Sequence, residues 1–260
     1  MSNPFIKKLS GLADLTAADV RALAEVTTLP RCYASNQDII REGDEPGPML
    51  VILEGWACRY KILSNGARQI IGYLIPGDIG YIPIGRPTVM DHSILSITNT
   101  TIASLCEPRL ENLTELYPSI KDALSMAHRT EEAIMRSWIV SMGRRNATER
   151  IAHLLCELYI RLKSVGCAME NQFAFPITQV TLADTLGITP VHVNRTLMDL
   201  RLSRIIEVYR AHLAIIDPRR LIDIAGFDDT YLTLFFNDRA GQSVIRDVHR
   251  AQIAQPSFHI

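Results

Sequence analysis

The stretch TPVHVNRTLMDLR, residues 189–201, opens with a hydroxyl side chain followed by proline, an order that is typical of a helix start. Thr189 can cap a helix by accepting a backbone N–H bond, and Pro190 then occupies the first helical position, where its missing donor is not needed. Apolar residues follow at spacings of four and three, at Val193, Leu197 and Leu200. Residues with this spacing share one face of a 3.6-residue period, so the stretch predicts a helix with one buried side.

The other side of this predicted helix carries side chains that can recognise nucleic acid. Asn194 and Arg195 each have paired hydrogen-bonding groups, which suit the edges of adenine and guanine respectively. They lie among Val191, His192 and Arg201, which the spacing also places away from the buried side. A short helix that exposes both residues can recognise DNA, although an amphipathic helix with a merely solvated face would show a similar pattern.

The segment just upstream, ITQVTLADTLGI at residues 177–188, favours DNA recognition. Thr178 is a candidate cap, and Gly187 stands where the chain must turn between two short helices. Leu182, Ala183 and Leu186 lie on the apolar face of this segment. Ala183 is small enough for the close approach of two helices that a helix-turn-helix requires. The second helix of that motif enters the major groove with its first residues at the bases, so the two segments together predict DNA binding.

The charge layout agrees with a DNA-binding region. The chain has 260 residues, enough for one large or two modest domains, and its 27 basic and 28 acidic residues nearly balance. Residues 136–220 nevertheless carry 12 Lys and Arg against 7 Asp and Glu, a net charge of +5, whereas residues 1–135 have a net charge of −4. Positive charge thus gathers around the predicted motif, as phosphate binding needs, although a solvated basic face would have a similar excess.

The five cysteines show no metal-binding spacing. They are Cys32, Cys58, Cys106, Cys156 and Cys167, and no C-x-x-C pair occurs among them. Neither a zinc ribbon nor a clustered iron–sulfur site is therefore expected, and we predict no metal. The odd count and the absence of a secretory leader predict reduced thiols in the cytoplasm. Because no apolar run approaches the ~20 residues that cross a bilayer, no membrane partner is expected.

Upstream of residue 118 the pattern changes from helical to extended. Residues 12–29 favour a short helical region in which Thr16 and Asp19 form a capping-box pair. Residues 31–106 consist of short β-branched runs broken by glycines, which is typical of a β-barrel or sandwich with tight turns. Within them SNGA, residues 64–67, predicts a hairpin because Asn-Gly readily takes positive φ.

A long helix is expected from Pro118 to about Met142. Its apolar stripe alternates spacings of four and three, with Glu131 as the misfit, and leads toward the predicted DNA-reading motif. Such a stripe favours a parallel dimer helix, although it could simply pack on its own β domain. The residues predicted for the dimer interface are Ile120, Leu124, Ala127, Ile134, Trp138 and Met142.

Two further elements complete the C-terminal region. Asn146 and Glu149 form a capping pair for a helix that ends near Gly166. Residues 204–217 favour two short strands, which would be the wing of a winged helix.

A β-barrel, a long helix and a winged helix-turn-helix, in this order, make up the Crp/Fnr transcription regulators, and the sequence resembles that family over about residues 5–235. The motifs that carry the resemblance are EGD, ILEG and PGD in the barrel, RNATERIAHLL in the following helix, and TPVHVNRTL. Their combination is most similar to the branch found in rhizobia and related bacteria.

The resemblance implies an α+β fold with an N-terminal antiparallel β-roll of the jelly-roll, cyclic-nucleotide-binding-like type. The implied domains are 1–117, a dimerisation helix 118–143, a winged helix-turn-helix domain 144–235, and a C-terminal extension 236–260 whose order and role the sequence leaves open.

The resemblance also implies roles in the helix-turn-helix. In the family the caps of both helices of the motif contact phosphates, which corresponds to Thr178 and Thr189. Arg195 matches a family arginine that pairs with guanine. Val191 departs from the family pattern, in which a glutamate is common, so the half-site is expected to differ from the usual one. The predicted DNA-contacting residues are Thr178, Gln179, Thr189, Pro190, Val191, His192, Asn194 and Arg195.

The barrel departs from the cyclic-nucleotide binders of the family at its ligand anchors. Those proteins use a Gly-Glu turn for the ribose and an Arg-Ser/Thr pair for the phosphate. Here Gly80 is followed by Tyr81, and His92 stands where arginine would, with Ser93 kept. These four residues are therefore expected to form a degenerate effector pocket that does not use cyclic AMP. His92 is also a conceivable metal or haem ligand, but a lone His between strands is more often a hydrogen-bonded structural residue. No cofactor is predicted, and the effector is unknown.

Two classes of function compete for this sequence. The first is a homodimeric transcription factor that binds a palindromic operator in double-stranded DNA, with RNA polymerase as the partner that the resemblance implies. The second is an enzyme with a catalytic cupin-like barrel, which would need several His and a carboxylate on adjacent strands, whereas residues 31–106 contain only His92. No nucleophile elbow or phosphate loop occurs elsewhere. The sequence therefore predicts a regulator and not an enzyme, and a regulator controlled only by its own abundance is a third possibility.

Overall fold

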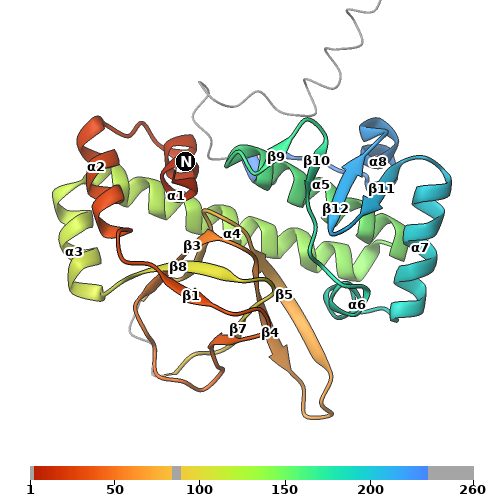
Figure 1. Ribbon diagram of the computed structural model, residues 1–260, viewed down its shortest axis with the longest axis horizontal. Helices are drawn as coiled ribbons and strands as arrows, with labels where there is room; N and C mark the ends of the chain where they lie inside the picture. Colours follow the sequence, from red (N-terminus) through yellow and green to blue (C-terminus); the bar gives the residue numbers. More distant parts are fainter. Residues whose placement is uncertain (1–2, 84–88, 234–260) are drawn as a thin grey trace, which may run out of the picture.

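A long helix, α4 (Pro118–Arg144), organises the molecule, for which the computed structural model describes residues 3–83 and 89–233. In Figure 1 this helix runs across the molecule, with the N-terminal helices at one end, the C-terminal domain at the other, and a β-roll below it. The expected extension 236–260 lies outside the described residues.

Three helices pack at the N-terminal end of α4. They are α1 (Pro4–Leu12), α2 (Ala17–Val26) and α3 (Glu107–Leu116). The sequence analysis did not predict α1, although Asn3 caps it by accepting a bond from the backbone N–H of Phe5 at 3.0 Å and Pro4 occupies the first turn. The start of α2 has the predicted capping box of Thr16 and Asp19.

The predicted β domain is a roll of two four-stranded antiparallel sheets, with strand orders β1-β8-β3-β6 and β2-β7-β4-β5. The strands are β1 (Arg31–Tyr33), β2 (Asp38–Ile40), β3 (Met49–Glu54), β4 (Ala57–Ile62), β5 (Arg68–Leu74), β6 (Ile79–Tyr81), β7 (Ser93–Ser96) and β8 (Thr100–Leu105). The predicted hairpin at 64–67 joins β4 to β5, where Gly66 takes a φ of 83°. This positive φ explains why glycine occupies the turn.

The two faces of the β4–β5 sheet have different partners. Along β4, Ala57 packs in the core inside the roll, whereas Cys58 and Tyr60 belong to a cluster that continues into the C-terminal domain. This follows from strand geometry, since successive side chains point to opposite faces of a sheet. On β5, Tyr73 joins the outer cluster, with its ring 6.0 Å from that of Trp138 on α4. The outer face of the roll therefore supports the C-terminal domain.

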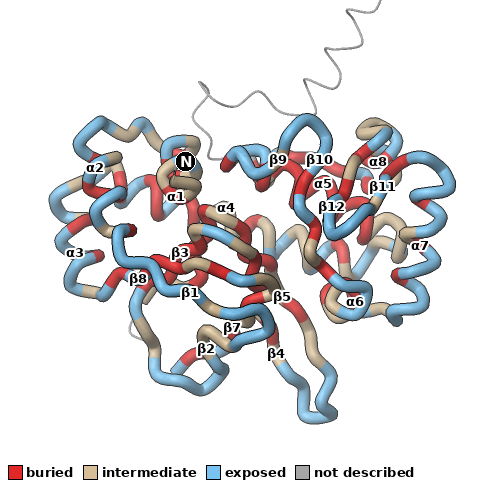
Figure 2. Tube along the Cα trace, viewed as in Figure 1, coloured by how far each residue is buried: buried red, intermediate tan, exposed pale blue. Residues whose placement is uncertain are grey.

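The C-terminal domain is built around a buried helix, α5 (Ala147–Ser164), which starts at the predicted capping box of Asn146 and Glu149. Figure 2 shows α5 buried along much of its length. The remaining elements are β9 (Ala168–Met169), β10 (Gln172–Ala174), α6 (Gln179–Leu186), α7 (Pro190–Leu202), β11 (Ile206–Tyr209), β12 (His212–Ile215), α8 (Pro218–Ala225) and α9 (Thr230–Thr233). The predicted wing is the β11–β12 hairpin, which β10 and β9 extend into a four-stranded sheet.

The apolar stripe of α4 faces the chain's own interior, and the six residues predicted for the dimer interface each contact other parts of the same chain. Three of the six residues are buried in the cluster of the N-terminal helices: Ile120, Leu124 and Ala127. The other three face the C-terminal domain: Ile134, Trp138 and Met142. The stripe therefore packs within the chain, because α4 supports the N-terminal helices and the C-terminal domain in turn and each covers part of it.

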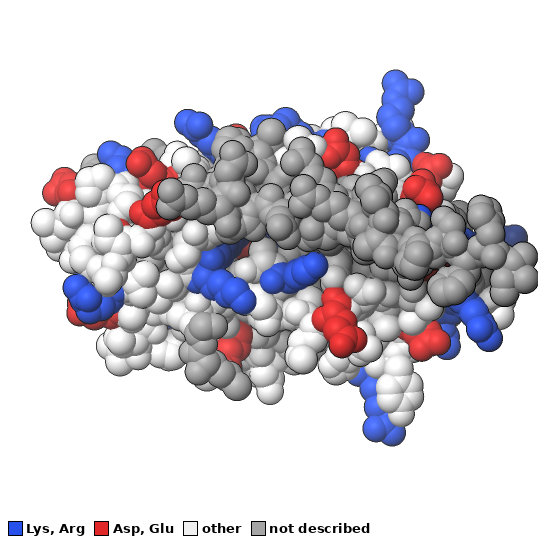
Figure 3. Space-filling model, turned by 90° about the horizontal axis from the view of Figure 1, so that it is seen from above, with Lys and Arg blue, Asp and Glu red and all other residues white. Residues whose placement is uncertain are grey.

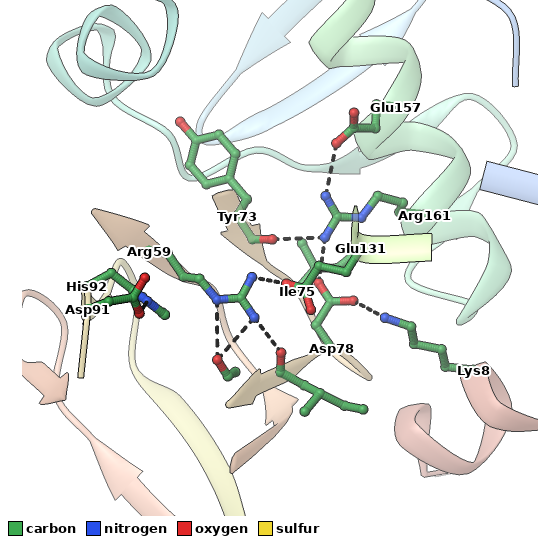
Figure 4. Close-up of polar contacts among 12 residues, drawn as sticks. Lys8, Arg59, Tyr73, Ile75, Asp78, Asp91, His92, Glu131, Glu157 and Arg161 are labelled. Carbon is green, nitrogen blue, oxygen red and sulfur yellow. Dashed lines mark hydrogen bonds and ion pairs between the residues drawn. The ribbon is translucent and has the colours of Figure 1, made fainter. Parts of the chain in front are cut away.

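A buried ion network joins the roll to the C-terminal domain (Figure 4). Asp78, in the turn between β5 and β6, accepts hydrogen bonds from Lys8 Nζ of α1 and from Arg161 Nη2 of α5, both at 2.6 Å. Arg161 also donates to the carbonyl of Tyr73 at 2.9 Å and to the fully buried carboxylate of Glu157 at 3.1 Å. Burial alone would raise the pKa of Asp78, but Lys8 and Arg161 hold it down at about 2. The charged form of Asp78 therefore stabilises the attachment of α5 to the roll.

We expect the substitution Asp78→Asn to lower the free energy of unfolding at neutral pH by about 2 kcal/mol, since each unit of pKa shift corresponds to ~1.4 kcal/mol. The pKa of Asp78 is lowered in the folded state from 3.8 to about 2. The stabilisation is thus complete above pH 3.8 and is lost as the pH falls through about 2. Urea unfolding of both proteins between pH 6 and pH 2 measures this difference in stability, which should shrink toward the acid end.

The matched control for this experiment is Asp14→Asn, because Asp14 is exposed. Its effect on the free energy of unfolding should be small at every pH. A stability difference between Asp78→Asn and the wild type that stays constant from pH 6 to pH 2 would contradict the assigned role of the Asp78 charge.

Candidate nucleic-acid interface and effector pocket

Helices α6 and α7 form the predicted helix-turn-helix. Thr178 caps α6 by accepting a bond from the backbone N–H of Thr181 at 3.1 Å, and Thr189 caps α7 by accepting from that of His192 at 3.3 Å. Gly187, at the end of α6, takes the left-handed conformation with a φ of 63°, which turns the chain between the two helices. Each cap and the turn are those that the sequence predicts.

The face of α7 that points away from the core presents the predicted DNA-contacting residues together. On the inner side Val193, Thr196 and Leu200 are buried, and Leu197 is partly buried against the same core. All eight residues predicted to contact DNA are exposed: Thr178, Gln179, Thr189, Pro190, Val191, His192, Asn194 and Arg195. The amide Nδ2 of Asn194 donates to Oε1 of Gln179 at 3.1 Å, so one hydrogen bond joins α7 to the start of α6 on this surface. Sequence reasoning included both residues but did not foresee their contact.

The opposite side of α6 is attached to the roll. Arg68 of β5 forms an ion pair with Asp184 at 2.8 Å, and the hydroxyls of Tyr73 and Thr185 lie 2.5 Å apart. Gln69 Nε2 adds a bond to the carbonyl of Thr185 at 3.1 Å. These contacts occupy the inner side of α6 and leave the exposed face of α7 free. No pattern in the sequence links β5 to α6, because the contact joins segments more than 100 residues apart.

Arg150 fixes the motif to the end of α4, a role that sequence reasoning missed. Its guanidinium donates to the carbonyl of Leu186 at 2.8 Å, to that of Met142 at 2.7 Å, and to that of Arg145 at 2.8 Å. One side chain of α5 thereby satisfies carbonyls at the ends of both α4 and α6. Arginine suits this position because its fork of N–H donors reaches several acceptors at once.

Several exposed arginines surround the helix-turn-helix. The exposed basic residues of α7 and the wing include Arg195, Arg201, Arg204 and Arg210. The turn of the wing has Arg210 and Ala211 at positive φ, and the Arg210 guanidinium lies over the ring of Tyr209, 5.1 Å from its centre. On the face seen in Figure 3, the visible basic and acidic side chains are interspersed. The exposed arginines of α7 and the wing are available for contacts with phosphate oxygens.

The residues of the expected effector pocket form hydrogen bonds with different parts of the chain. The carbonyl of Gly80 accepts from Arg59, and the Ser93 hydroxyl accepts from the backbone N–H of Glu42 at 2.9 Å. His92 lies at hydrogen-bond distance from its neighbour Asp91, 2.7 Å from Nδ1 to Oδ1. That contact lowers the pKa of Asp91 and supports the structural interpretation of the histidine.

Two polar atoms of the expected pocket have no hydrogen-bond partner among residues 3–83 and 89–233. They are the hydroxyl of Tyr81 and Nε2 of His92. Burial raises the pKa of Tyr81 above its ordinary value of 10. No group of three or more His, Cys, Asp or Glu within the described chain is arranged to hold a metal ion.

Arg59 points into the roll and uses its whole guanidinium within the chain (Figure 4). Nη2 donates to the carbonyls of Ile79 at 2.8 Å and Gly80 at 3.0 Å, and Nη1 forms an ion pair with Glu131 of α4. Glu131 is the polar misfit in the apolar stripe, and this contact explains its presence there. The pair joins strand β4 of the roll directly to the long helix.

The space beside this ion pair is small. A cavity of about 30 Å³ lies between α1, β6, α4 and α5, lined by Lys8, Asp78, Glu131 and Arg161 among others. Sites for small organic ligands usually measure about 300 Å³ or more, so this cavity has room for water but not for a nucleotide. The cations that line it are paired with carboxylates of the same chain.

Within residues 3–83 and 89–233, no helix combines the length and the apolarity needed to span a membrane.

Comparison with known proteins identifies relatives over most of the chain. Residues 30–117 match the cyclic nucleotide-binding domain family, and residues 149–224 match the Crp-like helix-turn-helix domain family. The chain is 28% identical over 202 residues to the transcriptional activator protein FnrL of Cereibacter sphaeroides, covering 76% of this chain and 81% of the relative. It is 27% identical over 195 residues to the nitrogen fixation regulation protein FixK of Bradyrhizobium diazoefficiens, covering 75% and 81%.

The solved structure of FixK2 from Bradyrhizobium japonicum superposes with a TM-score of 0.68 at 22% identity, covering 77% of this chain and 98% of that one. This similarity confirms the predicted α+β fold of a β-roll, a long helix and a helix-turn-helix domain. The relatives are transcription regulators and not enzymes, and FixK among them agrees with the expected placement near the rhizobial branch. With both domain families matched in the expected order, this chain belongs to the Crp/Fnr family of transcriptional regulators.

Proposed function

We propose that this regulator binds a palindromic operator as a homodimer, with α7 of each chain in the major groove. The observation that carries the proposal is the exposed surface of α6 and α7, where eight side chains suited to phosphates and bases lie together while the inner faces of both helices are buried. A symmetric dimer presents two such helices to half-sites one helical turn apart, ~34 Å along the DNA. Membership in this family also supports RNA polymerase as a partner.

Within this surface we assign base recognition to Arg195. The side chain is exposed one and a half turns into α7, on the side opposite the buried Val193. An arginine at this depth can contact either a phosphate or the edge of a guanine, and the two roles differ in their consequences. The match to the guanine-pairing arginine of the family favours the second role.

We expect Arg195→Ala to weaken binding to the cognate operator by about 1–3 kcal/mol and to remove the preference for guanine at one position of each half-site. Affinities for the operator and for operators with each guanine replaced measure this effect. The control is Arg201→Ala, an exposed arginine in the last turn of α7, which should weaken all operators alike. A variant Arg195→Ala that keeps every guanine preference of the wild type would rule out the assignment.

For the dimer we propose the exposed side of α4 in place of the stripe that the chain itself covers. Met135, Ile139 and Val140 are 47%, 71% and 54% exposed, large values for apolar side chains on a helix. Met135 and Ile139 are four residues apart and therefore share one face of the helix. Two copies of this face can pack around a twofold axis, as isologous dimers do.

We expect Ile139→Glu to convert the dimer to monomers, because a buried carboxylate without a partner is strongly unfavourable in an apolar interface. Sedimentation velocity at micromolar concentration measures the mass, and operator affinity should fall by at least about tenfold, or ~1.4 kcal/mol. Leu29→Glu is the control, since Leu29 is also exposed (84%) but lies at the N-terminal end of the molecule. An Ile139→Glu protein that sediments as the wild-type dimer would place the interface elsewhere.

We further propose that DNA binding does not depend on cyclic AMP. A buried phosphate needs a free cationic group, whereas the guanidinium of Arg59 is bonded to two carbonyls and to Glu131. The same contacts join the roll to α4 without a ligand, which supports a regulator that acts independently of an effector and is controlled by its abundance.

Titration calorimetry with cyclic AMP and cyclic GMP should accordingly give no binding heat, and operator affinity of the dialysed protein should change less than about twofold when either nucleotide is added. The dialysed protein alone should bind the operator. Micromolar affinity for either nucleotide, or operator binding that appears only with the nucleotide, would refute this part of the proposal.

A further inference from the structure

The hydrogen bond between Asn194 and Gln179 lies on the surface that should face DNA. Gln179 is the first residue of α6 and Asn194 the fifth of α7, both are exposed, and Nδ2 of Asn194 is 3.1 Å from Oε1 of Gln179. Surface amides of this kind normally bond to water. Here two of them bond to each other across the helix-turn-helix, at the place where its two helices come closest to a bound duplex.

The remaining hydrogen-bonding groups of Asn194 match one base. A side-chain amide has two N–H donors and an oxygen with two lone pairs. After one N–H is donated to Gln179, Asn194 keeps one N–H and its oxygen. In the major groove adenine offers an acceptor at N7 beside a donor at N6, which this pair of groups satisfies, whereas guanine offers two acceptors and would oppose the amide oxygen.

The contact with Gln179 also fixes the direction of the Asn194 amide before DNA arrives. A free surface asparagine has several side-chain orientations and must lose this freedom when it binds a base. Gln179 accepts one N–H of Asn194, which leaves the second N–H and the oxygen of Asn194 for a base. Gln179 retains its own N–H donors, which suit a phosphate oxygen.

We propose that Gln179 is a positioning residue that holds Asn194 for bidentate recognition of adenine, so that the two helices read this base as one unit. The inference rests on the proposed DNA-binding function and adds one base of the half-site and the residue pair that selects it. The Gln179–Asn194 pair would also supply base specificity that Val191 cannot, because the valine side chain has no group that accepts a hydrogen bond from a cytosine amino group.

The test uses the full-length protein and a duplex that the wild type selects from a random pool. Affinities are then measured for every single-base variant of one half-site, and for duplexes in which each adenine is replaced by 7-deazaadenine, which lacks the N7 acceptor. We expect one adenine whose replacement weakens wild-type binding by about 5- to 100-fold and leaves the affinity of Asn194→Ala unchanged. Gln179→Ala should lower discrimination at that same base by about 3- to 10-fold. In the Asn194→Ala background it should not change discrimination at that base any further.

Two variants separate positioning from a general loss of affinity. Gln179→Glu keeps an oxygen that accepts from Asn194, so it should bind all DNA more weakly because of its charge but keep the adenine preference. Val180→Ala, at the neighbouring exposed residue of α6, should change neither the overall affinity for DNA nor the adenine preference. Discrimination by Gln179→Ala within twofold of the wild type, or a base preference that does not depend on Asn194, would overturn the inference. A wild type that selects no sequence from the pool would instead contradict the proposed function itself.

Discussion

The buried pairing of Asp78 with Arg161 and Lys8 is the constraint on which the arrangement of this molecule depends. It joins a turn of the roll to α1 and α5, three segments that are far apart in sequence. Removing one partner of a buried ion pair leaves the other charge buried and unpaired, which strongly destabilises the folded protein. This network and the contacts between β5 and α6 together hold the roll and the C-terminal domain in one orientation.

That orientation determines which surfaces remain available. The long helix α4 lies between the two domains, so its apolar stripe is covered by its own chain and its outer side is left exposed. The inner side of α6 is attached to β5 through Arg68 and Tyr73, while the outer face of α7 has no such cover. A regulator of this family needs free surfaces for a second chain and for DNA, and the internal packing leaves one of each.

The interior of the roll is joined to the long helix by contacts within the chain. The guanidinium of Arg59 lies inside the roll, where Glu131 and two backbone carbonyls satisfy it. A charge inside a protein must be paired, and here the partner comes from the long helix and not from a small molecule. The link between roll and helix is therefore a permanent part of the fold.

Local patterns in the sequence determined the caps, turns and strands, because these depend on neighbouring residues: Thr178, Thr189 and Asn146 cap the helices they were expected to cap, and Gly187 makes the expected turn. The order of these elements was also enough to reveal the family. Which side of α4 is covered, and the pairs Arg59–Glu131, Asp78–Arg161 and Gln179–Asn194, were decided by tertiary structure alone. Helical periodicity defines an apolar face but not whether the chain itself or a second chain covers it. A contact between distant segments leaves no periodic signal in either of them, so only the folded chain shows which groups meet.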